Sequence, residues 1–84
     1  MSEHTVRGAI EAILMVASEP VGTSELADVL GVSSEEIDAE LRALAAEYLG
    51  EGQEYPRGFE LREVADGWRI YSARAYADVV GRFV

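Results

Sequence analysis

The sequence has no cysteine, no lysine and a single histidine, His4. Without cysteine the chain can form neither a disulfide nor a thiolate metal site. Its longest apolar run, residues 12–17, is far too short to span a bilayer. The first residues lead into an amphipathic stretch and not into the apolar core of a signal peptide. We therefore expect a cytoplasmic protein without a membrane segment.

Positive charge is also scarce, because seven arginines face 16 acidic residues and the formal net charge is −9. Nucleic-acid binding rests largely on clustered basic residues that release counterions from phosphates. No such cluster is evident along the chain, so a protein partner is the better expectation. With 84 residues and a hydrophobic content of 49%, the chain is long enough for one small folded domain.

What the sequence does contain is the pattern of a helix-turn-helix over residues 21–48. Thr23 is placed to cap a short helix, and Gly31 to end it in the left-handed conformation. Ser33 is expected to cap the next helix, with Glu36 completing a capping box. Apolar residues then recur at helical spacing on one face, namely Ile37, Leu41, Leu44 and Tyr48.

The second helix of this motif is acidic, with one arginine, Arg42, among five carboxylates: Glu35, Glu36, Asp38, Glu40 and Glu47. In a DNA-binding protein this helix would enter the major groove. Phosphates would repel a helix with that charge. The pattern thus has the form of a DNA-binding motif without its charge.

A first helix is expected over about residues 5–17, with a core face of Val6, Ile10, Ile13, Leu14 and Ala17. Its last turns are apolar on all sides, which is typical of a helix buried among its neighbours. We favour that interpretation. The alternative is that Met15 or Val16 faces a partner chain.

Residues 59–72 alternate in polarity and are rich in strand-forming residues, which predicts a β-hairpin with its turn at Asp66–Gly67. Charges on this hairpin are mixed, whereas a DNA-clamping wing is more often plainly basic: Arg57, Arg62 and Arg69 accompany Glu60, Glu63 and Asp66. Ser72 is placed to cap a last helix. Residues 50–56 read as a mobile loop.

Three helices, a hairpin and a further helix follow one another in winged-helix order. The predicted fold class is α+β, a winged helix-turn-helix with three helices, a two-stranded wing and a C-terminal helix. Residues 1–84 are expected to form a single winged-helix domain.

Three segments carry a family resemblance: AIEAILMVASEPV, LADVLGV and RGFELREVADGWRIYSARAYADVV, beginning at residues 9, 26 and 57. They closely resemble the N-terminal half of bacterial segregation and condensation protein B, the ScpB family. The resemblance implies a second winged-helix domain beyond residue 84 and a homodimer. It also implies binding to the kleisin ScpA and through it to the SMC ATPase at the nucleoid.

The residues offer no catalytic, cofactor or metal site and no site for a small-molecule substrate. His4 lies near the chain end, Ser33–Ser34 lacks a His–Asp arrangement, and Glu35–Glu36 fit the positive end of a helix dipole. Large apolar residues exceed what a hairpin and one helix need. The predicted protein-interface residues are Met15, Val16, Trp68, Tyr71, Tyr76, Val79, Val80 and Phe83.

The leading hypothesis is a non-enzymatic, dimeric adaptor subunit of the bacterial SMC–kleisin condensin, without sequence-specific DNA binding. The alternative is an acidic winged-helix transcription regulator that reads DNA through its wing arginines.

Overall fold

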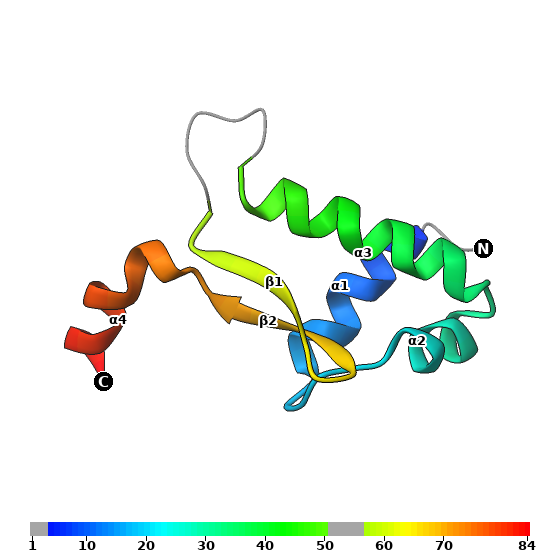
Figure 1. Ribbon diagram of the computed structural model, residues 1–84, viewed down its shortest axis with the longest axis horizontal. Helices are drawn as coiled ribbons and strands as arrows, with labels where there is room; N and C mark the ends of the chain where they lie inside the picture. Colours follow the sequence, from blue (N-terminus) through cyan, green and yellow to red (C-terminus); the bar gives the residue numbers. More distant parts are fainter. Residues whose placement is uncertain (1–3, 51–56) are drawn as a thin grey trace.

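The computed structural model describes residues 4–50 and 57–84. The α-helices are α1 (Val6–Val16), α2 (Thr23–Leu30), α3 (Ser34–Tyr48) and α4 (Ala77–Phe83) (Figure 1). Strands β1 (Phe59–Val64) and β2 (Gly67–Ser72) form an antiparallel hairpin, and a short 3-10 helix, η1 (Arg74–Tyr76), precedes α4. The predicted winged-helix order and α+β class are confirmed. The predicted loop over residues 50–56 lies, except for Gly50, outside the described residues.

Local sequence signals account for three of the helix ends. The Thr5 hydroxyl accepts a hydrogen bond from the Gly8 amide at the start of α1. Ser33 does the same for the Glu36 amide at the start of α3, although within the described chain the Glu36 side chain makes no return bond to complete a capping box. Gly31 ends α2 at φ 71°, in the predicted left-handed conformation.

The predicted cap at Thr23 is wrong. Gly22 is the N-cap of α2 and Thr23 is already its first helical residue, so its side chain makes no capping bond. The reason is that residue 21 is held extended by a β-bridge to Trp68, with hydrogen bonds of 2.8 and 2.9 Å in the two directions. This bridge fixes the entry into α2 one residue earlier than the side-chain signal indicated.

The core lies between the first three helices and the inner face of the hairpin. Its buried residues are Ile10, Leu14, Leu26, Ala27, Ile37, Leu41, Leu44, Tyr48, Leu61 and Trp68. The predicted apolar face of α3 is thus entirely buried. Burying a large aliphatic side chain contributes about 1.5–3 kcal/mol, so this face anchors α3 under the hairpin.

The hairpin turn differs by one residue from its prediction. Val64 pairs with Gly67, so the two turn residues are Ala65 and Asp66 and Gly67 already belongs to β2. Ala65 takes a positive φ of 50° in this turn. The predicted cap at Ser72 is also wrong, because Ser72 is the last residue of β2 and Ala73 precedes η1.

Candidate protein-interaction surfaces

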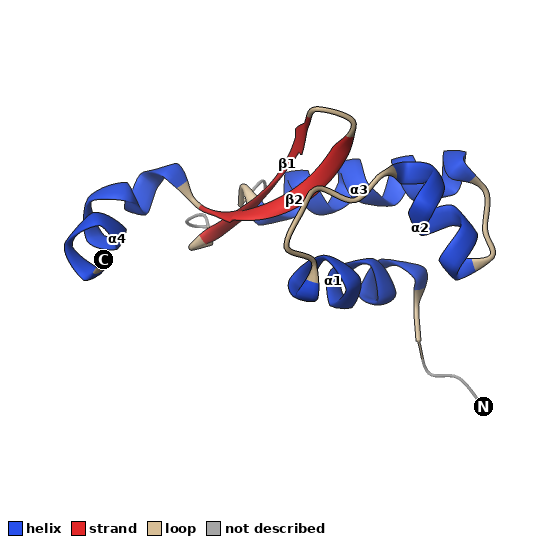
Figure 2. Cartoon of the chain, turned by 90° about the horizontal axis from the view of Figure 1, so that it is seen from below, coloured by secondary structure: helices blue, strands red, loops and turns tan. Residues whose placement is uncertain are grey.

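Helix α4 projects from the end of the hairpin, away from the three-helix body, in both views (Figures 1 and 2). No residue of η1 or α4 is buried. The exposed apolar side chains include four of the predicted interface residues: Tyr76, Val79, Val80 and Phe83, the last 88% exposed. They form the α4 patch. Tyr76 ends η1 and the other three lie on α4, and the interface role of all four stays a prediction.

Met15 and Val16 point away from the core at the end of α1, with exposed fractions of 69% and 82%. The favoured interpretation, a first helix buried on all sides, is therefore wrong. Helices α2 and α3 and strand β2 contact α1, whose buried residues are Ile10 and Leu14, and the side chains of Met15 and Val16 stay largely exposed. Since α1 and α4 lie apart in both views, Met15 and Val16 form a separate surface.

Trp68 is a core residue and not a member of an exposed patch, which corrects its place among the predicted interface residues. Only 4% of it is exposed. Its strand position turns the indole toward α3, where the Arg42 guanidinium lies 5.5 Å from the ring centre. Tyr71 lies on the opposite face of the hairpin and is partly covered by arginine side chains.

The side chains of Arg62 and Arg69 both approach the Tyr71 ring on the outer face of the hairpin. The Arg62 guanidinium is 4.0 Å and that of Arg69 5.5 Å from the centre of the Tyr71 ring. Below them the Glu60 carboxylate, with only 11% of its side chain exposed, lies 3.0 Å from Arg62 and 3.7 Å from Arg74. We call Glu60, Arg62, Arg69, Tyr71 and Arg74 the wing arginine face.

Sequence reasoning listed three of these charges separately and did not find the cluster. The signal was present in the alternation of the strands, since residues 60 and 62 must share a face and residues 69 and 71 must share a face. What was missing was the register that sets the two pairs opposite each other, Glu60 with Tyr71 and Arg62 with Arg69.

The acidic surface of α3 keeps its negative character in the fold. Three arginines are paired along it: Arg7 with Glu40 at 2.6 Å, Arg42 with Asp38 at 3.0 Å and Arg57 with Glu47 at 3.8 Å. The hydrogen bond to Glu40 raises the pKa of the Arg7 guanidinium above its ordinary value. Glu35 and Glu36 stay exposed at the start of the helix. This surface suits a cationic or neutral partner and not a phosphate backbone.

Burial and a hydrogen bond to Glu11 raise the pKa of the Tyr48 phenol above its ordinary value. Tyr48 also makes an edge-to-face contact with Phe59, at 4.9 Å between ring centres. It therefore joins α1, α3 and β1 at one point. The Glu11 carboxylate and the Tyr48 phenol therefore have a structural role, because their hydrogen bond holds α1 and α3 together.

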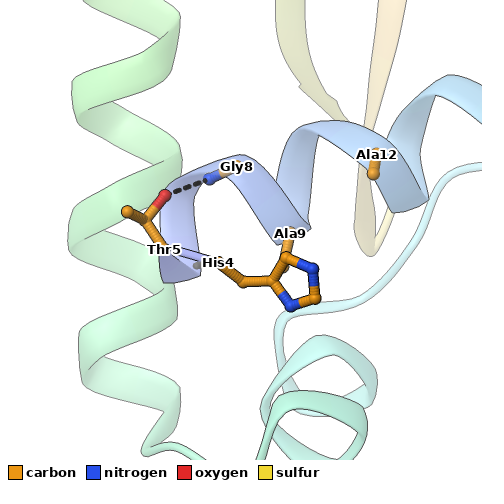
Figure 3. A pocket seen from close by; sticks show the side chains of 5 residues that line it. All are labelled: His4, Thr5, Gly8, Ala9 and Ala12. Atoms are coloured by element: carbon orange, nitrogen blue, oxygen red, sulfur yellow. Dashed lines mark hydrogen bonds between the residues drawn. The ribbon is translucent and has the colours of Figure 1, made fainter. Parts of the chain in front are cut away.

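A shallow groove runs along the first turns of α1, lined by His4, Thr5, Gly8, Ala9 and Ala12 (Figure 3). The His4 ring lies beside Ala9, and the Thr5 hydroxyl is occupied by the Gly8 amide. In the described part of the chain no group of three His, Asp or Glu side chains is placed to hold a metal ion. Within the same residues, no helix is both long and apolar enough to cross a membrane.

A sequence profile of the family described as segregation and condensation complex subunit ScpB matches residues 8–84. The chain belongs to the ScpB family. Segregation and condensation protein B of Desulforamulus reducens is 33% identical over 76 residues, which cover 90% of this chain. The chain spans 40% of the length of the curated ScpB relatives it matches.

Solved ScpB structures share the fold. ScpB from Mycobacterium tuberculosis matches with a TM-score of 0.83 and 27% identity, over 98% of this chain and 51% of that one. A dimer of an ScpB N-terminal domain, crystallised with an ScpA peptide, matches with a TM-score of 0.79 and 24% identity, over 93% of both chains. The second likeness is one of fold alone.

Proposed function

We propose that this chain is the N-terminal winged-helix domain of a non-enzymatic adaptor subunit of the bacterial SMC–kleisin condensin. The ScpB family match over residues 8–84 is the observation that carries the proposal. In this role two copies hold one kleisin chain, shape its middle segment and so influence ring opening by the SMC ATPase. The process served is chromosome condensation and segregation, in the cytoplasm at the nucleoid.

The proposed partner is the kleisin ScpA. A related ScpB N-terminal domain was crystallised as a dimer with an ScpA peptide, and the present chain has uncovered surfaces suited to protein contacts. The proposal also includes a second winged-helix domain in the complete protein. It is supported by the curated relatives, because this chain spans only 40% of their length.

Self-association through the α4 patch is part of the same proposal. Helix α4 has seven residues and none is buried, whereas isolated helices shorter than about 12 residues are marginal in water. Burial of Val79, Val80 and Phe83 against a second copy would supply the packing that this helix lacks within its own chain. Clustered exposed apolar and aromatic side chains are typical of such interfaces.

The alternative, a DNA-binding regulator, has less support. The helix that would enter the major groove is acidic, and the turn end of the wing is bonded to the domain through Val21 and Trp68. A wing held in this way is not free to reach around a duplex. Three wing arginines are the observation in its favour, and the test must therefore include DNA.

The complete parent protein would be tagged, purified from nuclease-treated lysate, and its retained partners identified by mass spectrometry. Recovery of the kleisin and SMC subunits is the expected result. Loss of every partner once nucleic acid is digested would contradict the adaptor function and favour the regulator.

A further inference from the structure

The wing arginine face combines charges in a way that the fold itself does not need. Arg62 and Arg69 stand directly opposite each other on adjacent strands, and like charges in that position destabilise a hairpin. Both guanidinium groups also gather over one ring, that of Tyr71. A cross-strand arginine pair therefore costs stability unless something negative lies between its members.

Negative charge within the chain only partly compensates the Arg62–Arg69 pair. The same oxygen of Glu60 lies near Arg62 and Arg74, while Arg69 forms no ion pair among the residues that the structure describes. Three positive charges thus share one carboxylate. In a domain with a net charge of −9, this face carries a local excess of two positive charges.

The face is only partly covered: the Glu60 side chain is 11% exposed and that of Arg62 34%, while Arg69 and Tyr71 are half-buried. Phe59, Leu61, Trp68 and Ile70 point to the core, so side-chain alternation places residues 60, 62, 69 and 71 on the other side of the hairpin. Arg74 keeps 76% of its side chain exposed. The Arg62 guanidinium lies 4.0 Å from the centre of the Tyr71 ring and directs its Nε to Glu60, which leaves its two terminal nitrogens for an oxyanion.

We propose that the wing arginine face is a docking site for an acidic peptide segment, with a carboxylate of the peptide between Arg62 and Arg69. The occupant is an acidic segment of the kleisin partner, so this inference rests on the proposed function and adds a surface to it. Charge complementarity is the basis. A segment with one or two carboxylates gains from the local positive excess.

A nucleic acid fits the same face less well. Its dense phosphates would meet the field of a domain with nine excess negative charges. Binding of a polyanion requires positive charges spread along its path, whereas the arginines here are confined to one spot. Nucleic acid is therefore an outcome of the test and not the proposed ligand.

The test measures the affinity of this chain for purified ScpA from the same genome, by titration calorimetry at physiological salt, for wild type and Arg69→Glu. We expect the substitution to weaken binding at least tenfold. Arg57→Glu, which changes the same charge outside the proposed contact, should stay within about twofold of wild type, as expected for a rim charge. Arg69→Gln removes the charge without adding a negative one and should weaken binding to an intermediate extent.

The melting temperature distinguishes a loss of docking from a loss of folding. Arg69→Glu removes the like-charge pair and places an acid opposite Arg62, so its melting temperature should rise by about 1–5 °C while ScpA binding falls. Wild-type affinity in both Arg69 variants would overturn the docking site and leave the proposed function intact. Failure of wild type to bind ScpA at all would instead remove the proposed function.

Two further results would also overturn the proposal. One is a melting temperature that falls in Arg69→Glu together with binding, since the residue would then be needed for the fold. The other is tight binding of duplex DNA, measured by fluorescence anisotropy, that Arg69→Glu abolishes while ScpA binding is unchanged. The face would then be a nucleic-acid contact.

Discussion

Gly67 lies so close to Pro20 that a Cβ atom at position 67 would approach the Pro20 carbonyl carbon to 2.9 Å. The same atom would come within 2.9 Å of the Val21 nitrogen. Together with the bridge between Val21 and Trp68, this contact holds the turn end of the wing against the connection from α1 to α2. The glycine in the turn signal is required for a tertiary contact and not for a positive φ.

Gly67→Ala should therefore destabilise the domain. The added methyl group meets backbone atoms that cannot rotate away, and overpacking of this kind costs about 1–3 kcal/mol. Urea denaturation followed by circular dichroism measures the change. Gly58→Ala is the matched control, because a Cβ at Gly58 meets nothing within 4 Å. Equal stability of the two variants would contradict the close contact.

Two threonines at helix starts should respond differently to alanine. Thr5 caps α1 through its hydroxyl, so Thr5→Ala should cost about 1 kcal/mol. Thr23 is the first residue of α2 and makes no capping bond, so Thr23→Ala should change the unfolding free energy by no more than about 0.5 kcal/mol. A larger loss at Thr23 than at Thr5 would restore the cap predicted from the sequence.

Tyr48 should make the domain sensitive to alkaline pH. Its phenol has a raised pKa in the fold, whereas in the unfolded chain its pKa is about 10. The unfolded state therefore loses this proton first, and the stability present below that pH declines as pH rises toward the folded-state pKa. Because lysine and cysteine are absent, few other groups titrate in this range.

The measurement compares unfolding of wild type and Tyr48→Phe at several pH values between about 9 and 11. Tyr48→Phe should be less stable at neutral pH by about 1 kcal/mol, since it loses the bond to Glu11. Its stability should nevertheless fall less steeply with pH than that of wild type. Parallel curves for the two proteins would show that Tyr48 ionises equally in both states.

Self-association should depend on the α4 patch. Phe83→Asp places a charge on its most exposed aromatic residue and should convert a dimer of the chain into a monomer at high micromolar concentration. Val29→Asp, at a position 68% exposed on α2, should leave the dimer intact. Sedimentation equilibrium gives both masses. A wild-type monomer, or association that salt abolishes, would contradict an apolar interface.

The sequence predicted the elements whose signals are local. The face of α3 from Ile37 to Tyr48 follows from helical spacing, and the end of α2 at Gly31 from the conformation that glycine allows. The cap at Thr23 was misjudged because the bridge between Val21 and Trp68 sets the entry into α2. The turn was misjudged because Val64 pairs with Gly67, and Trp68 because its strand position turns it toward α3. Each depends on pairing or packing that no local signal specifies.

The candidate sites follow the same division. The sequence alone shows more large apolar residues around Phe83 than the core needs. The structure exposes Val79, Val80 and Phe83 on the projecting helix α4. The wing arginine face could not be found in this way. Its geometry depends on strand register, which sets Arg62 against Arg69, and no local signal in either strand specifies that pairing.

Light scattering after gel filtration of this chain mixed with purified ScpA tests the adaptor account most directly. The account predicts one complex that contains one ScpA and two copies of the 9.1 kDa chain, formed without nucleic acid and retained at physiological salt. Separate elution of the two proteins, or a complex that appears only when duplex DNA is added, would contradict it.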